Sequence, residues 1–339
     1  MGKTFVHRVL SSELGTPKKV IVFSRDEAKQ HEMRLSYLHK TATTDEVIYN
    51  NFINVLEFRI GDVRNYDEVC SAVKSADIVV NAAALKQVPT CEYFPNQAIM
   101  TNCFGAYNIV RAIEENSYPV QTVIGISTDK ACKPVNVMGM TKSLQERIFI
   151  SANILNPNTR FICVRYGNVL ASRGSVIPLF HSQIRNGGPV TITVPGMTRF
   201  LLSLDQAVNT VFTALKEAKR GETYVPDAHS ATVMNIAKAL IGDRRIEIKI
   251  TGIRPGEKMH EIMVSEEEVH HCVKRGDYFA IRPMLPELAD GPAKEKNALT
   301  KEFSSADSLL DFQGTVELLK KHKLLVEDRD LTAGEEFLR

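Results

Sequence analysis

The feature that most constrains this chain is an apolar segment that leads into a cluster of polar side chains and then into a helix. Residues 120–126 have the composition of a buried strand, and Thr128, Asp129 and Lys130 stand at its carboxyl end. A helix is predicted to begin near Asn136, a residue type that often caps helices. Open α/β sheets bind ligands at the carboxyl ends of strands, so the ordered string predicts a site. Taken singly, an Asp–Lys pair before a helix is also typical of a loop salt bridge.

Strand and helix patterns alternate through about the first half of the chain, which predicts βαβ units around a parallel sheet. The strands expected there span residues 19–23, 55–60, 76–81, 120–126 and 161–165. Two helices are expected to begin at residue 27 and near residue 136. Others are expected over residues 66–75, 96–115, 205–219 and 315–323. After residue 167 the pattern changes to Gly-, Pro- and Ser-rich loops with short strands such as 190–194. The predicted fold class is α/β: a Rossmann-type, doubly wound parallel sheet with a smaller α/β substrate-binding lobe.

The same change of pattern predicts the domain limits. We expect a dinucleotide-binding domain over residues 1–165, completed by a helical return at about 205–223. Residues 166–204 and 224–282 are expected to form the substrate lobe. Residues 283–339 are expected to form a linker rich in Pro and charge, followed by a helical tail.

The start of the chain departs from the pattern of a dinucleotide fold. Residues 1–10 have the pattern of a first helix, whereas such a fold needs a strand and a Gly-rich turn before that helix. Gly2 is expected to be the last glycine of the turn. A mis-set start or a clipped chain is our preferred interpretation, and a truncated, inactive paralogue is the alternative. A chain lacking that central strand is expected to fold poorly or to lack its cofactor, since two strands would have unpaired backbone groups.

Composition excludes several classes of function. The chain has 339 residues, 44% hydrophobic and 24% charged, and a formal charge of +2, which gives no argument for nucleic acid or an acidic membrane surface. Its six cysteines contain no C-x-x-C pair, so neither a zinc site nor a disulfide framework is indicated. No apolar run is long enough to span a membrane, and no signal-peptide core is present. We expect a cytoplasmic protein without a metal.

Charged side chains after the strand at residues 19–23 indicate the cofactor. Ser24 and Arg25 follow that strand, and Lys29 lies in the helix after it. An acid at this place selects NAD, whereas an arginine accommodates the 2′-phosphate of NADP, so NADP is expected rather than NAD. A solvated charged turn is the alternative interpretation.

Two further strand ends carry cofactor candidates. Asp62 and Val63 follow the strand expected at residues 55–60 and are placed to accept the adenine amino group. Ala82 and Ala83 follow the next strand, where a ribose and nicotinamide need close approach to the backbone. A run of small residues is also compatible with close packing alone.

Five segments together carry a family resemblance: residues 81–89, 127–142, 165–178, 197–200 and 252–261. They resemble the extended short-chain dehydrogenase/reductase superfamily and, within it, the bacterial polysaccharide-biosynthesis (CapD/CapE-like) branch. The chain looks most similar to UDP-N-acetylglucosamine 4,6-dehydratases that invert C5, over about residues 2–282. The resemblance implies an NADP-dependent enzyme acting on a UDP-sugar, and a homo-oligomer, by family likeness a hexamer.

The resemblance also implies roles for single residues. Thr128, Met138 and Lys142 occupy the positions of the superfamily's Thr…Tyr-x-x-x-Lys pattern, with Met138 in place of the tyrosine base. Met138 and Lys142 are four residues apart and share one helical face, from which Lys142 is expected to orient the nicotinamide ribose. The implied substrate contacts are Lys86, Asn168, Arg199, Arg254 and Glu257. Lys86 is also within reach of the nicotinamide, and Arg199 can equally be a structural ion pair.

The chemistry expected of such a dehydratase is an internal redox cycle with loss of water. Lys130 is the leading candidate for the base at C5, Asp129 assists at the C6 hydroxyl, and Thr128 hydrogen-bonds the C4 oxygen. Two alternatives remain: a UDP-sugar 4-epimerase, which needs no acid/base pair for C5 and C6, and a non-catalytic dinucleotide-binding paralogue.

Overall fold

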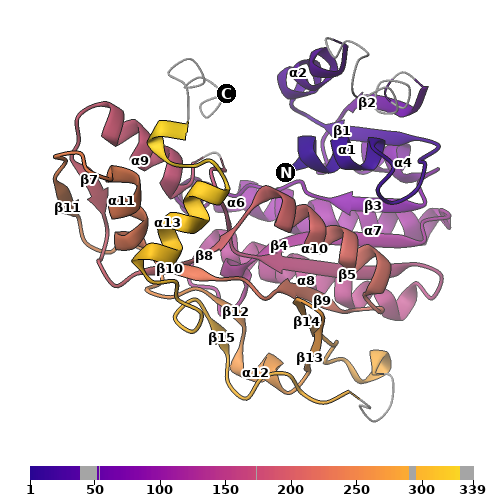
Figure 1. The fold of residues 1–339 in the computed structure, drawn as a ribbon. Coiled ribbons are helices and arrows are strands. Elements are labelled where there is room, and N and C mark those ends of the chain that lie inside the picture. Colours follow the sequence, from indigo (N-terminus) through magenta and orange to yellow (C-terminus); the bar gives the residue numbers. More distant parts are fainter. Residues whose placement is uncertain (39–51, 53, 173, 290–294, 329–339) are drawn as a thin grey trace.

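The computed structural model describes residues 1–38, 52, 54–172, 174–289 and 295–328, and a six-stranded sheet lies at its centre (Figure 1). The strand order is β13-β14-β9-β5-β4-β3. The bounds are β3 (Ile78–Asn81), β4 (Thr122–Thr128), β5 (Arg160–Tyr166), β9 (Thr223–Pro226), β13 (Cys272–Arg275) and β14 (Tyr278–Ile281). Strands β3, β4, β5 and β9 run parallel, whereas β14 and β13 add an antiparallel edge. The predicted fold class is confirmed.

The β4–β5 pair is the longest ladder of the sheet. It is parallel and in register from Thr122 opposite Arg160 to Thr128 opposite Tyr166. Both strands are almost entirely buried, as their apolar sequences require of a sheet covered on both faces. This register brings the polar residues that follow β4 to the same edge as those that follow β5.

Helices cover both faces of the sheet. One apolar core joins β4 and β5 to α4 (Tyr66–Val73), α7 (Gly105–Asn116) and α8 (Val137–Leu155). The opposite core joins β5, β9 and β14 to α10 (Leu204–Glu217). The expected helix over residues 96–115 is divided into α6 (Pro95–Ala98), a π-helical turn η1 (Ile99–Phe104) and α7.

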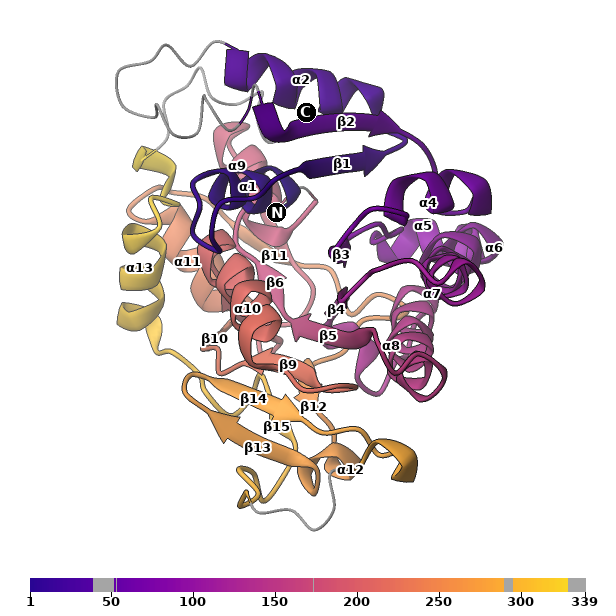
Figure 2. The same cartoon turned by 90° about the vertical axis from the view of Figure 1, so that its right-hand side faces the viewer.

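Strands β1 (Val20–Ser24) and β2 (Leu56–Ile60) form a separate parallel pair. They share a small core with α1 (Gly2–Leu10) and α2 (Glu27–Leu38), and Figures 1 and 2 show them at the end of the molecule opposite β13. Within the described ranges no ladder joins β1 to β3. All five residues of β1 are only half-buried, whereas β4 is nearly all buried.

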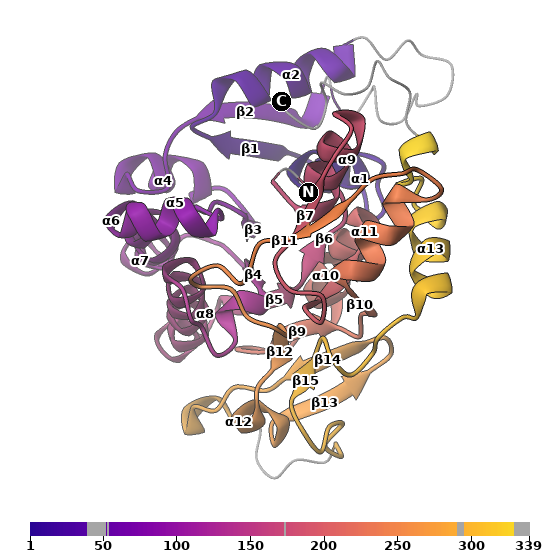
Figure 3. The ribbon, with the colours of Figure 1, turned by 90° about the vertical axis from the view of Figure 1, so that its left-hand side faces the viewer.

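The smaller lobe has its own apolar core, and Figure 3 shows the helices of this lobe gathered together. Its elements are α9 (Val176–Arg185), β7 (Val190–Ile192), α11 (Val233–Ile241), β11 (Ile248–Ile250) and α13 (Phe312–Lys321). Three short ladders complete the fold: β10 (Ser230–Thr232) with β8 (Thr198–Leu202), β8 with β6 (Asn168–Val169), and β12 (Ile262–Val264) with β15 (Phe303–Ser304). Short helical segments are α5 (Val88–Tyr93), η2 (Asp129–Ala131), α12 (Glu266–Val269), η3 (Pro286–Leu288) and η4 (Val326–Asp328).

The division into domains remains a prediction, but strand pairing changes one part of it. Strands β9, β13 and β14, expected in the substrate lobe, hydrogen-bond into the central sheet instead. The expected tail helix is α13, which packs on the lobe core. Part of the expected linker, residues 290–294, lies outside the described residues, as do residues 329–339.

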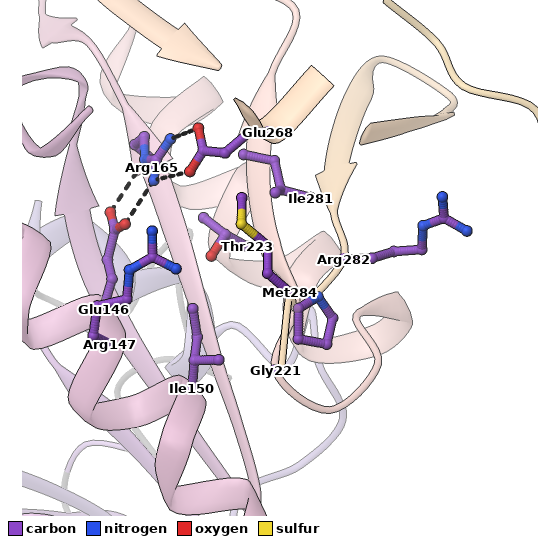
Figure 4. A pocket seen from close by; sticks show the side chains of 11 residues that line it. Glu146, Arg147, Ile150, Arg165, Gly221, Thr223, Glu268, Ile281, Arg282 and Met284 are labelled. Atoms are coloured by element: carbon purple, nitrogen blue, oxygen red, sulfur yellow. Dashed lines mark hydrogen bonds and ion pairs between the residues drawn. The ribbon is translucent and has the colours of Figure 1, made fainter. Parts of the chain in front are cut away.

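A buried ion cluster fastens the sheet to the helices and to the later segment (Figure 4). Arg165, near the end of β5, donates to both carboxylate oxygens of Glu146 on α8 at 3.1 and 2.6 Å. It also donates to both oxygens of Glu268 on α12 at 2.8 and 2.9 Å, and to the Met263 carbonyl at 2.7 Å. The planar guanidinium thus uses all its donor sites. Burial disfavours the Glu268 carboxylate, but Arg165 lowers its pKa to about 2.

We expect Arg165→Met to lower the free energy of unfolding by about 3–5 kcal/mol, because it leaves two buried carboxylates without a cation. Chemical denaturation at pH 7 measures this. Arg147→Met is the matched control, because Arg147 and Arg165 line one pocket but the Arg147 side chain is exposed. We expect Arg147→Met to change the free energy of unfolding by no more than about 0.5 kcal/mol. Equal losses in the two variants would contradict this account of the cluster.

Candidate active site

The Lys130 ammonium is the centre of the polar cluster at the end of β4. Its Nζ lies 2.9 Å from Asp129 Oδ1, 3.2 Å from Glu261 Oε1 and 3.3 Å from Asn168 Oδ1. These acceptors come from η2, from the residue before β12 and from β6. An ammonium has three protons, so each can be directed at one acceptor. Sequence reasoning identified three of these four residues and missed Glu261.

The environment keeps Lys130 charged. Burial favours the neutral amine, but the charges of Asp129 and Glu261 outweigh it and raise the Lys130 pKa above its usual value. An amine that is protonated and surrounded by acceptors is a proton donor at neutral pH, and it becomes a base only after losing that proton.

Asp129 is the most deeply buried acid of the cluster, with no exposed side-chain surface. Its Oδ1 accepts from Lys130 and, at 2.8 Å, from the Thr128 hydroxyl. Among the described residues, no donor reaches its Oδ2. A buried carboxylate oxygen without a partner is costly, so this atom is suited to receive a proton or hydroxyl from a ligand. The Thr128 proton, expected at a substrate oxygen, points to Asp129 in this structure.

Met138 and Lys142 lie one turn apart on α8, as expected, but neither faces an open site. Met138 is buried in an apolar cluster with Cys91 and Ala98. The Lys142 ammonium donates to the Ile126 carbonyl of β4 and, at 2.6 Å, to Gln145 Oε1. These two acceptors hold its ammonium in this structure, and its role in orienting a nicotinamide ribose stays a prediction. Burial lowers the Lys142 pKa to about 8.

The residues expected to hold the adenosine end of a cofactor gather across the ends of β1 and β2. A guanidinium nitrogen of Arg25 lies 3.6 Å from Asp62 Oδ2. Arg64, which sequence reasoning missed, donates to the same carboxylate at 2.9 and 2.6 Å. Burial opposes the charged form of Asp62, but Arg64 and then Arg25 lower its pKa. Lys29 instead pairs with Asp26.

The other two residues predicted beside these charges have mainly backbone roles. The Ser24 hydroxyl accepts from the Asp26 N–H at 3.1 Å, which fixes the turn after β1. The Val63 carbonyl accepts from Asn108 at 2.9 Å, which anchors the segment after β2 to α7.

Small side chains line the edge beyond β3. Ala82 is exposed and Ala83 half-buried, so backbone is accessible at this strand end. Lys86 is exposed. The pKa of the Met1 amino group is lowered, first by burial of that amino group and second by the positive charge of Lys86. Gly2 opens α1 and has no atom within 4 Å of the place where a Cβ would lie. Open backbone, small side chains and nearby cations at one sheet edge fit a dinucleotide.

Of the distal residues, Arg199 has the contacts of a structural residue. It is buried, and it donates to the Thr198 carbonyl at 2.7 Å and the Lys258 carbonyl at 3.1 Å. Its Nε lies 3.9 Å from Glu261 Oε1. These contacts match the structural ion pair that the sequence left open.

Arg254 and Glu257 lie on a loop that packs against the start of α8. The Arg254 side chain is exposed, and Glu257 Oε2 accepts from its backbone N–H at 3.4 Å. Asn136, which caps α8, donates to the Gly256 carbonyl at 2.8 Å. The loop that carries the exposed Arg254 side chain is thus attached to the start of α8.

Comparisons with known proteins agree with this fold. The family model described as "Polysaccharide biosynthesis protein" matches residues 1–283. The chain belongs to the polysaccharide biosynthesis protein family. A protein of Rickettsia canadensis named UDP-glucose 4-epimerase is 43% identical over 83% of this chain and 79% of its own. The crystal structure of Pen from Bacillus thuringiensis shares 32% identity, with a TM-score of 0.84 over 96% of this chain and 95% of that one.

A more distant member of the same fold is DesIV, a dTDP-glucose 4,6-dehydratase from Streptomyces venezuelae solved with NAD and TYD. It is 17% identical, with a TM-score of 0.62 over 76% of this chain and 83% of that one, a likeness that shows the fold alone. The polysaccharide biosynthesis family member described here thus shares the α/β fold of DesIV. Within its described residues, no helix has both the length and the apolar character needed to cross a bilayer.

Lys142 should make stability depend on alkaline pH. Below about pH 8 both the folded and the unfolded chain carry its proton, so folding bears the full cost of burying the charge. Between pH 8 and its ordinary value of 10.5 the folded chain loses that proton first. We therefore expect the wild type to gain on the order of 3 kcal/mol relative to Lys142→Met across this window, measured by urea unfolding. A pH-independent difference would show that Lys142 titrates normally.

Proposed function

We propose that this chain is an NADP-dependent UDP-N-acetylglucosamine 4,6-dehydratase, inverting at C5, that makes a nucleotide sugar for surface polysaccharide. The observation that carries the proposal is the Lys130 cluster, in which one ammonium and two carboxylates meet at the end of β4. Removing water across C5 and C6 needs a base and an acid beside the group that serves the C4 hydroxyl. A simple exchange at C4 needs neither.

The chemistry assigns complementary roles to the two adjacent residues. A bound nicotinamide supplies hydride transfer, taking hydride from C4 and returning it to C6. The free Oδ2 of Asp129 is suited to take the C5 proton once C4 is a ketone. The Lys130 ammonium is suited to protonate the departing C6 hydroxide, so that water leaves. This exchanges the roles expected from sequence, because the structure surrounds Lys130 with acceptors. Return of a proton to the opposite face of C5 would invert that centre.

The substrate's diphosphate needs cations outside the catalytic cluster. Arg254 is exposed on its loop and can bind a phosphate through two nitrogens, and Lys86 is exposed at the end of β3. Glu257 and Asn168 are proposed to contact the sugar or the ribose, as expected from the sequence. Arg199 is better assigned to holding the loop that carries Lys258, because backbone carbonyls occupy its guanidinium.

A UDP-sugar 4-epimerase is the second candidate, and one observation favours it: the Rickettsia relatives carry that name at 41 to 44% identity. The epimerase would use the same cofactor and the same nucleotide-sugar loops. It would leave the C5 and C6 positions unchanged.

Incubation with UDP-N-acetylglucosamine and NADP⁺ in D₂O separates the candidates. We expect a 4-keto-6-deoxy sugar with deuterium at C5 and inverted configuration there, observed by NMR. Lys130→Ala should reduce elimination at least about 100-fold, because it removes a proton donor. Lys133→Ala is the control, since that exposed lysine pairs with Glu302 and should retain activity.

Formation of the C4 epimer alone, without deuterium at C5, would replace the dehydratase with the epimerase. Normal turnover by Lys130→Ala would contradict the assigned role of the cluster. Binding of the dinucleotide without either product would favour the non-catalytic alternative.

The NADP preference is tested at Arg25. Arg25→Ala should weaken NADP binding about 10- to 100-fold and NAD binding only a few-fold, because the guanidinium would hydrogen-bond the 2′-phosphate. Isothermal titration calorimetry with both dinucleotides measures this. Arg34→Ala, a loss of the same charge on the exposed side of α2, should change neither. If Arg25→Ala weakens the binding of NADP and NAD equally, Arg25 is a surface charge that does not select the cofactor.

A further inference from the structure

Glu261 is a second carboxylate in the Lys130 cluster, and the family pattern used above assigns it no role. Its side chain is 3% exposed, and its Oε1 lies 3.2 Å from Lys130 Nζ. Its other oxygen, Oε2, meets no donor among the residues that the structure describes. A carboxylate removed from water and left half-satisfied lowers stability, so its presence beside a catalytic ammonium points to function.

The backbone of Glu261 is fixed by the segment that follows the linker. Its N–H donates to Ser305 Oγ at 2.9 Å, and its carbonyl accepts from the Ser305 N–H at 2.8 Å. Ser305 Oγ also lies 2.6 Å from Thr198 Oγ1. The antiparallel pair of β12 with β15 continues this attachment. Glu261 is therefore held by elements from two distant parts of the chain rather than by a mobile loop.

The charged groups around Lys130 come from η2, from β8 and from the segment before β12, whereas β6 contributes the neutral Asn168. Asp129 on η2 and Glu261 before β12 are negative, whereas Arg199 on β8 and Lys258 before β12 are positive. The formal charges of these two acids and two cations cancel. Loss of either acid therefore leaves a net positive charge around Lys130. Glu261 is the acid that does not adjoin Lys130 in sequence, and its removal leaves the η2 backbone unaltered.

We propose that Glu261 is a positioning residue that holds Lys130 in place as an ammonium, and that Ser305 fixes Glu261 for this task. The catalytic part of this inference rests on the proposed dehydratase function. The effect on the Lys130 amine does not depend on that function.

The direct test measures the Lys130 amine without substrate. Trace acetylation with acetic anhydride across pH, read by peptide mass spectrometry, reports the deprotonated fraction of each lysine. Glu261→Gln keeps the shape of the side chain and removes its charge. We expect Lys130 to be labelled about tenfold more at a given pH below its midpoint, equivalent to a midpoint about one unit lower. Glu266→Gln removes the same charge from an exposed position nearby and should leave the midpoint unchanged.

A second variant leaves every charge in place. Ser305→Ala removes the hydroxyl that accepts from the Glu261 N–H, and we expect a smaller shift of the Lys130 midpoint in the same direction. Glu261→Asp keeps the charge on a shorter side chain, so its Lys130 midpoint should lie close to that of the wild type. An unchanged Lys130 midpoint in Glu261→Gln, or an equal shift in Glu266→Gln, overturns the proposal.

Activity then separates the two levels of the inference. If the wild type forms the 4-keto sugar, Glu261→Gln should lower kcat and move the alkaline limb of its pH profile to lower pH, with KM nearly unchanged. A uniform loss of kcat with no movement of the limb would indicate a merely structural residue. If the wild type makes no 4-keto sugar, the proposed function fails, whereas the labelling experiment still tests Glu261.

Discussion

The guanidinium of Arg165 is the interaction on which the arrangement of the site depends. It joins the carboxyl end of β5 to α8 through Glu146, and to the β12–α12 segment through Glu268 and the Met263 carbonyl. Helix α8 carries Met138 and Lys142, and Glu261 immediately precedes β12. One buried cation therefore joins β5 both to the helix that carries Met138 and Lys142 and to the segment that follows Glu261. A hydrophobic residue here would hold the layers together without fixing their register so closely.

The cluster around Lys130 has a different design from the one around Arg165. Every donor site of Arg165 is used, which suits a rigid attachment. Around Lys130 the ammonium is satisfied, but Asp129 and Glu261 each retain one oxygen without a donor among the described residues. Chemistry needs such unsatisfied atoms, since an acceptor already occupied cannot take a proton from a ligand. Under the proposed function, the two clusters would represent structural and reactive uses of buried charge.

Sequence predicted those parts of the molecule that depend on local pattern. The parallel strands and the placement of Asp129 and Lys130 follow from a buried strand that ends in polar residues. Glu261 was missed because it lies far from Lys130 in sequence, and the packing of β12 against η2 that brings them together is not visible in any local pattern. Sequence did not indicate the acceptors of Lys142, because helical spacing gives the face of a residue, not the acceptor that its long side chain finds. Sequence placed the residues of β13 and β14 in the lobe, because no local pattern shows which sheet edge these strands join.

The attachment of Glu261 to Ser305 has a consequence for how members of this family are compared. The match to the family model ends at residue 283, and Ser305, which holds the backbone of this acid, lies beyond it. Part of the support of the candidate site is thus supplied by sequence that a domain-based alignment does not score. Two relatives with the same domain and different tails can then hold the same acid differently. Classification of their reactions by the shared domain alone would overlook a segment on which selection can act independently.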